Sequence, residues 1–171
     1  MSDQELHTQR GQRIRKRDAI RETGVDPYGG RFENVVSSAA VRADAEPLNI
    51  GPGERSELRA RVAGRIVLLR IMGKLAFVTI RDGTGTLQLG LSRADLGDQW
   101  ALLKQLDLGD IVGADGVVGK TKTEELTLWT DQLTILCKSL LPPPEKWHGL
   151  TDVDLRYRRR YVDLFANPEV R

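Results

Sequence analysis

The feature that most constrains the fold is an alternation of apolar and polar residues with a period of two. From Leu58 to Leu68, apolar side chains occupy most even positions, and the odd positions include Arg59, Arg61 and Arg65. Successive side chains of a β-strand point to opposite faces of the sheet. The pattern therefore predicts a half-buried strand whose even-numbered residues face inward.

The same alternation predicts two more strands, followed by a helix and a final pair of strands. Inward positions of the second and third strands are apolar: Ala76, Val78, Ile80, Leu87, Leu89 and Leu91. The Asp-Gly-Thr-Gly sequence at 82–85 is a hairpin signal between them. Apolar residues at helical spacing in 96–106 predict a short helix ended by Gly109, and strands are expected at 110–118 and 125–135. This order predicts a five-stranded OB-fold barrel, with another small barrel or an open meander as the alternative.

The barrel region, residues 55–138, is expected to lie between two segments of different character. Residues 1–54 are predicted to hold a polar, basic helix from about Asp3 to Thr23, closed by Gly24, and then a meandering connection rich in Pro, Gly and Ser. Residues 139–171 include three consecutive prolines at 142–144 and are predicted to be a linker. The predicted fold class is mainly β with helices.

Two local clusters of basic residues stand out on a chain that is almost neutral. The chain has 26 Lys and Arg against 24 Asp and Glu, a net charge of +2. Residues 10–21 hold six basic residues against one acidic residue, and 156–160 hold four arginines. Such clusters favour contact with a polyanion, although a solvated helix face gives the same pattern.

Several classes of protein and of site are excluded or disfavoured. The chain has no run of 18 apolar residues, and its first 23 residues are charged throughout, so neither a membrane span nor a secretory signal is predicted. Cys137 is the single cysteine, which favours a cytoplasmic location. One cysteine and two histidines are too few for a structural zinc site, and no metal site or catalytic residues are predicted. His7 and His148 are expected to be ordinary hydrogen-bonding residues.

The outward face of the predicted barrel carries residues suited to single-stranded nucleic acid. The strand register brings Arg65, Phe77, Gln88 and Glu125 toward one surface. An aromatic ring can stack an unpaired base, Gln and Glu can hydrogen-bond a base edge, and Arg can bind a phosphate or a carbonyl. These four residues are therefore predicted to bind an unpaired segment of nucleic acid. The alternative is that Phe77 packs beneath the N-terminal helix or a loop.

Four stretches of the chain resemble one known family. They are Arg-Glu-Thr-Gly-Val-Asp-Pro-Tyr at 21–28, the segment 71–77 with Asp-Gly-Thr-Gly and Gln88 after it, Leu-Asp-Leu-Gly-Asp-Ile-Val-Gly at 106–113, and Lys-Trp-His-Gly-Leu at 146–150 with the arginine-rich segment 156–164. Together they resemble the N-terminal part of class II lysyl-tRNA synthetases. The last stretch discriminates most, because related aspartyl and asparaginyl synthetases share the OB barrel but lack that linker.

The resemblance implies an anticodon-binding function for the OB domain. In this family a base of the U-rich tRNA(Lys) anticodon stacks on the aromatic residue matching Phe77, and residues matching Arg65, Gln88 and Glu125 contact anticodon bases. Here Glu124 replaces the glycine that usually precedes Glu125. The basic helix and first strand are expected to contact the tRNA backbone through five residues: Arg13, Lys16, Arg17, Arg59 and Arg61.

For the full-length family, the resemblance implies ATP-dependent ligation of lysine to tRNA, with ATP and magnesium held by a C-terminal catalytic domain. The three class II motifs of that domain are not in this sequence, so these 171 residues are expected to hold no cofactor and to catalyse no aminoacylation. The family forms homodimers mainly through catalytic-domain surfaces, which leaves a monomer open for this chain. The alternatives are a free-standing OB protein that binds single-stranded nucleic acid, a structural fragment that docks on a synthetase, and a module of a lysyl-phospholipid enzyme.

Overall fold

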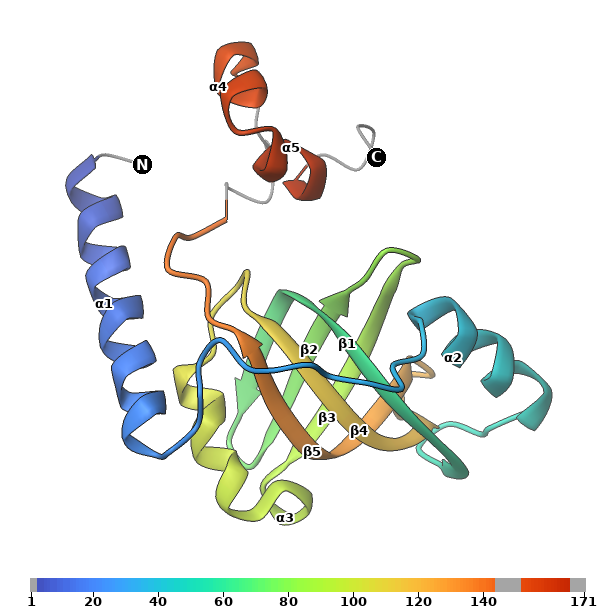
Figure 1. Ribbon diagram of the computed structural model, residues 1–171. Helices are drawn as coiled ribbons and strands as arrows, with labels where there is room; N and C mark the ends of the chain where they lie inside the picture. The colour runs from blue at the N-terminus through green and yellow to red at the C-terminus, as the bar shows by residue number, and fades with distance from the viewer. Residues whose placement is uncertain (1–2, 144–151, 167–171) are drawn as a thin grey trace.

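A closed five-stranded barrel forms the centre of the computed structural model, which describes residues 3–143 and 152–166 (Figure 1). The strands are β1 (Arg55–Met72), β2 (Leu75–Arg81), β3 (Thr86–Ser92), β4 (Ile111–Lys120) and β5 (Leu126–Cys137). Their order around the barrel is β1-β2-β3-β5-β4, and the long β1 closes it by pairing antiparallel with both β2 and β4. The sequence-based prediction of a five-stranded OB-type barrel is confirmed.

The core of the barrel contains the residues that the alternation predicted to face inward. All six inward residues of β2 and β3 are at most 1% exposed. They pack with apolar residues of the other strands: Val62, Ile66, Val112, Ala114, Val118, Leu128 and Ile135. The period of two therefore locates the core correctly over these two short strands, which pair without interruption.

The prediction that Leu68 faces inward is wrong. A β-bulge between Ile66 and Leu68 inserts an extra residue into β1, so Leu68 lies opposite Thr79 and Leu69 lies opposite Val78. Leu69 packs against the core in its place. A bulge shifts the side-chain alternation by one position, and apolar residues on both sides of this bulge hide the shift in the sequence.

The helical segment between β3 and β4 is divided into two short helices. They are α3 (Arg93–Leu96) and the 3-10 helix η2 (Gly97–Gln105), and α3 ends because Gly97, the first residue of η2, has a φ of 55°. The predicted apolar residues Leu96, Leu103 and Leu106 are buried, with exposures of 5% or less. The prediction of which residues face the core is therefore correct, whereas the prediction of one continuous helix is wrong.

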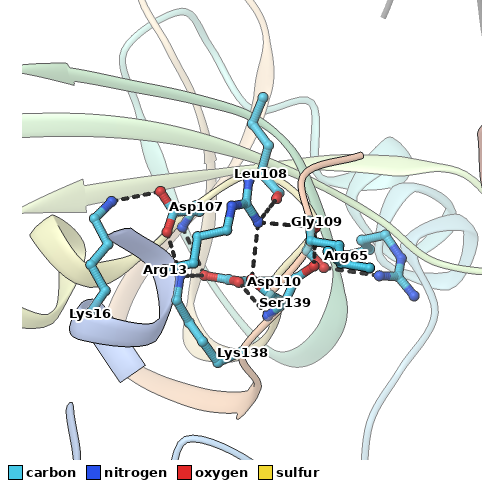
Figure 2. Close-up of polar contacts among 10 residues, drawn as sticks. Arg13, Lys16, Arg65, Asp107, Leu108, Gly109, Asp110, Lys138 and Ser139 are labelled. Atoms are coloured by element: carbon cyan, nitrogen blue, oxygen red, sulfur yellow. Dashed lines mark hydrogen bonds and ion pairs between the residues drawn. The ribbon is translucent and has the colours of Figure 1, made fainter. Parts of the chain in front are cut away.

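The N-terminal helix α1 (Asp3–Glu22) stands beside the barrel and packs against the 3-10 helix η2 (Figure 1). It ends as the sequence predicts, since Gly24 follows it with a φ of +79°. The side chains of α1 that pack against the rest of the molecule form a narrow stripe. They include Ile20, which is fully buried, and Arg13, which is 8% exposed. The Arg13 guanidinium donates hydrogen bonds of 3.0 Å to the carbonyl oxygens of Leu108 and Ser139, so α1 is fixed to the loop before β4 and to the segment after β5 (Figure 2).

A buried ionic cluster lies beneath this contact (Figure 2). The Lys138 ammonium is fully buried and lies 2.6 Å from an Asp107 oxygen and 2.7 Å from an Asp110 oxygen. Lys16 of α1 binds the other Asp107 oxygen at 2.6 Å. Burial raises the pKa of Asp110, whereas at Asp107 the effect of burial is outweighed by bonds from Lys138 and Lys16, which lower its pKa. The cluster ties helix, loop and barrel end together.

The segment predicted to meander before β1 contains a helix that the sequence did not indicate. It is α2 (Ser38–Ala45), followed by the 3-10 turn η1 (Glu46–Leu48). The Ser37 hydroxyl caps α2 by accepting a hydrogen bond from the Ala40 N–H, and Asp82 in the β2–β3 turn accepts one of 2.6 Å from the Ser38 N–H. An eight-residue helix is marginal alone, so these caps stabilise a helix that its own periodicity does not predict.

Two short helices also lie in the segment predicted to be a linker, namely α4 (Val153–Arg158) and α5 (Arg160–Ala166). Asp163 is fully buried and forms ion pairs with Arg156 at 2.9 Å and with Arg160 at 2.6 Å. Two arginines of the second basic cluster therefore have a structural role within this helix pair. His148 and the Lys-Trp-His-Gly-Leu stretch lie outside the described residues.

Candidate nucleic-acid interface

The pairing register places side chains of four strands in rows on the outer surface of the barrel. Directly paired residues share a face, so one row runs from β1 to β5 through four residues: Arg70, Phe77, Gly90 and Trp129. A neighbouring row consists of Leu68, Thr79, Gln88 and Thr127. We call these two rows the outer face.

Phe77 occupies the middle of the outer face and is half-buried. Its ring meets the Trp129 ring edge to face, with 6.3 Å between centroids and an interplanar angle of 66°. Gly90, its partner on β3, contributes no side chain between the two rings. The Trp129 indole occupies the space over Gly90, so the two rings form an aromatic pair on the outer face.

Gln88 lies one row away from Phe77, and its amide is fixed in place. The Gln88 Nε2 donates a hydrogen bond of 2.8 Å to the hydroxyl of Thr127, and Thr127 in turn donates to the carbonyl oxygen of Glu125. This chain of bonds orients an amide group beside the Phe77 ring. An oriented amide can read a base edge without first being ordered.

Arg65 lies farther along β1, directly opposite Arg81 of β2. It donates a 2.9 Å hydrogen bond to the carbonyl oxygen of Gly109, which joins it to the loop held by α1 (Figure 2). An open pocket of about 370 Å³ lies beside the two arginines and is also lined by Gly64 and Asp82. Two arginines and the Asp82 carboxylate therefore meet at this pocket.

Glu125 is exposed and immediately precedes β5. The residue before it, Glu124, has a φ of 66°, a left-handed conformation that favours glycine. The backbone therefore keeps a glycine-type shape although the glycine expected from the family is missing. The Glu125 N–H donates to the Thr121 hydroxyl at 3.1 Å, which holds the turn in place.

The five residues predicted to contact the tRNA backbone are all engaged within the chain. Arg13 is buried against carbonyl groups, as described above. The other four form ion pairs of 2.6–2.8 Å: Lys16 with Asp107, Arg17 with Asp18, Arg59 with Asp131, and Arg61 with Asp115. The structure brings Arg65, Phe77 and Gln88 onto neighbouring strands of one surface, with Glu125 at its border, whereas these five lie on α1 and along β1.

Sequence reasoning missed Trp129, Arg55 and Arg70. Trp129 follows the predicted inward residue Leu128, so its outward orientation could have been inferred from the alternation. Its position beside Phe77 could not, because it depends on the parallel pairing of β3 with β5. Arg55 lies before the alternating segment and carries no signal of its own.

Comparison with known proteins adds to this geometry. Residues 60–136 match the family model described as an OB-fold nucleic acid binding domain, of the tRNA anticodon type. The lysine–tRNA ligase of Carboxydothermus hydrogenoformans is 44% identical over the whole of this chain and 34% of its own length. The lysine–tRNA ligase of Nostoc punctiforme is 45% identical over 100% of this chain, and that of Moorella thermoacetica is 45% identical over 93% of it. In both cases the match covers 31% of the length of the relative. The chain matches the N-terminal part of lysine–tRNA ligases.

The matched part of the chain includes an OB-fold anticodon-binding domain. The chain spans about a third of the length of the curated relatives that it matches. In the part of the chain that the structure describes, no three His, Cys, Asp or Glu side chains form a group that could hold a metal ion. None of the described helices is long and apolar enough to cross a membrane.

Proposed function

We propose that this chain binds the anticodon loop of a tRNA on its outer face, as the anticodon-recognition part of a lysine–tRNA ligase. The observation that carries the proposal is the half-exposed ring of Phe77, which lies beside an oriented amide on the surface of an anticodon-type OB domain. An unpaired anticodon base offers the two features that these groups complement, a flat π-face and a polar edge.

Each of the four residues has a distinct role in this proposal. Phe77 stacks the central base, and Gln88 hydrogen-bonds its edge. Arg65 binds a carbonyl or phosphate oxygen while the Gly109 carbonyl holds its guanidinium in position. Glu125 accepts a hydrogen bond from a base amino or imino group, and the left-handed turn at Glu124 directs it.

Contacts to the tRNA backbone are proposed for Lys16, Arg17, Arg59 and Arg61. Because each cation already has a carboxylate partner, each must exchange that partner for a phosphate. The net gain from such an exchange is small, so these contacts contribute to orientation and to salt dependence more than to affinity. Arg13 was predicted to act in the same way, but its buried contacts suit a structural role better.

For the whole protein, we infer the reaction of the family: ligation of lysine to tRNA(Lys) at the expense of ATP, with magnesium, in a homodimeric cytoplasmic enzyme. ATP and magnesium are assigned to the catalytic domain of the family and not to residues of this chain. The contribution of this chain is to select the tRNA and to hold its anticodon.

The test is a titration of the chain with an anticodon stem-loop of tRNA(Lys), beside a stem-loop in which only the middle anticodon base is changed. Both titrations are repeated with Phe77→Leu, which keeps apolar volume while removing the stacking ring. We expect the wild-type chain to prefer the unchanged loop, and Phe77→Leu to weaken its binding by about 1–3 kcal/mol. The exposed Tyr161→Ala serves as the matched control for loss of an aromatic ring.

Equal binding of both loops, with no effect of Phe77→Leu, would contradict the proposal. It would favour the alternative function, a free-standing OB protein that binds single strands without sequence preference.

A further inference from the structure

The outer face continues beyond Phe77 to a second flat group that the anticodon-binding set does not include. The indole of Trp129 spreads over the sheet surface between two outward-facing glycines. A Cβ at Gly90 would come within 2.7 Å of the ring atom Cε3, and one at Gly119 within 3.0 Å of Cδ1. The indole therefore depends on two glycines, one on each neighbouring strand, to lie in this position.

Arg55 covers this indole. Its guanidinium carbon lies 4.5 Å from the Trp129 ring centroid, within the range of a cation–π contact. Asp95 of α3 holds the same guanidinium at 3.2 Å. Indole and carboxylate together fix the position of Arg55, although 46% of its side chain remains exposed.

The chemistry of the stack favours a base over a phosphate. The Asp95 carboxylate already balances the charge of Arg55, so a phosphate would have to displace it. A base needs no such exchange, because it can stack on the guanidinium plane. The Trp129 Nε1 is buried, so the indole N–H does not face a ligand.

The geometry points to a second base-stacking subsite made by Arg55 on Trp129, which we propose takes the anticodon-loop base next to the one on Phe77. The Trp129 ring beneath Arg55 lies 6.3 Å from the Phe77 ring, centroid to centroid, so the two subsites share one face and suit neighbouring nucleotides of a single strand. This inference rests on the proposed function and adds the Arg55–Trp129 stack to its site.

The test combines protein and RNA variants. Wild type, Arg55→Ala and Arg55→Lys are titrated with the tRNA(Lys) anticodon stem-loop and with two versions that are abasic on one or the other side of the middle anticodon base. We expect Arg55→Ala to weaken binding of the intact loop about fivefold or more. Arg55→Lys should weaken it similarly, because an ammonium keeps the charge without the plane. The abasic loop that lacks the base stacked on Arg55 should bind wild type and Arg55→Ala equally.

Three results would overturn the subsite. They are wild-type affinity in Arg55→Ala, full recovery in Arg55→Lys, which would indicate a phosphate contact, or an Arg55→Ala effect that persists with both abasic loops. Arg31→Ala, which removes an exposed arginine that forms an ion pair with Glu33, is the matched control for loss of charge. Thermal unfolding of each variant verifies that the fold is intact.

Phe77→Leu separates this inference from the function on which it rests. If Phe77→Leu weakens binding and Arg55→Ala does not, the second subsite alone fails. If neither variant weakens binding, the proposed function fails as well.

Discussion

At the scale of single residues, the site depends on backbone shapes and small side chains as much as on the groups that meet a ligand. Gly90 and Gly119 admit an indole that a Cβ would displace, and Glu124 adopts a left-handed conformation beside Glu125. The four candidate anticodon residues could be selected from the sequence because their chemistry is characteristic. The backbone conditions that position them could not, since they arise from contacts between distant strands.

Glu124 gives a stability prediction at this scale. A left-handed backbone costs a residue with a Cβ about 1–2 kcal/mol, whereas glycine adopts it without that cost but loses more entropy on folding. We expect Glu124→Gly to increase the free energy of unfolding by up to about 1 kcal/mol, as measured by urea denaturation. Lys122→Gly, in the same turn without a positive φ, is the control and should destabilise the chain. A loss of stability in both variants would show that strain at Glu124 is not relieved by glycine.

At the scale of elements, caps and bulges decide what the hydrophobic pattern leaves open. The alternation predicts each of the five strands to within a few residues, because each buries one face of its side chains. It does not predict the bulge in β1, which exchanges Leu68 for Leu69 in the core. It also misses α2, whose stability comes from Ser37 and from the β2–β3 turn.

Asp82 joins α2 to that turn and gives a prediction on pH. Burial opposes ionisation of its carboxylate, but hydrogen bonds from Ser38 and Thr84 outweigh burial and lower its pKa to about 2, against an ordinary value of 3.8. Between these two values the unfolded chain binds more protons than the folded chain. The stabilisation of the fold by the ionised Asp82 carboxylate is therefore complete well above pH 4, and it is lost as the pH falls toward 2.

The variant Asp82→Asn tests this linkage. At pH 7 we expect it to lower the free energy of unfolding by about 1–2 kcal/mol, a value discounted for partial solvent exposure. The difference from wild type should shrink as the pH falls from 4 to 2. Asp44→Asn, an exposed position on α2, is the control and should leave stability nearly unchanged. A difference that is constant over the whole pH range would refute the role of the carboxylate charge.

At the scale of the whole molecule, the buried cluster around Lys138 connects regions that are far apart in the sequence. Lys16 and Arg13 of α1, Asp107 before β4 and Ser139 after β5 all meet there (Figure 2). Arg65 binds the same loop from the outer face. The basic cluster in residues 10–21 suggested a surface for polyanions, but part of its charge holds the molecule together. Sequence alone does not distinguish the two roles, because both use the same residue types.

The measurement that tests the central claim most directly is a photocrosslinking map. A tRNA(Lys) anticodon stem-loop with 4-thiouridine at the middle anticodon position is bound to the chain and irradiated, and the modified peptide is identified by mass spectrometry. We predict crosslinks to the peptide of β2 that contains Phe77 and to its neighbours on the outer face. Crosslinks confined to α1 or to residues 152–166 would contradict the assignment of the anticodon to this face.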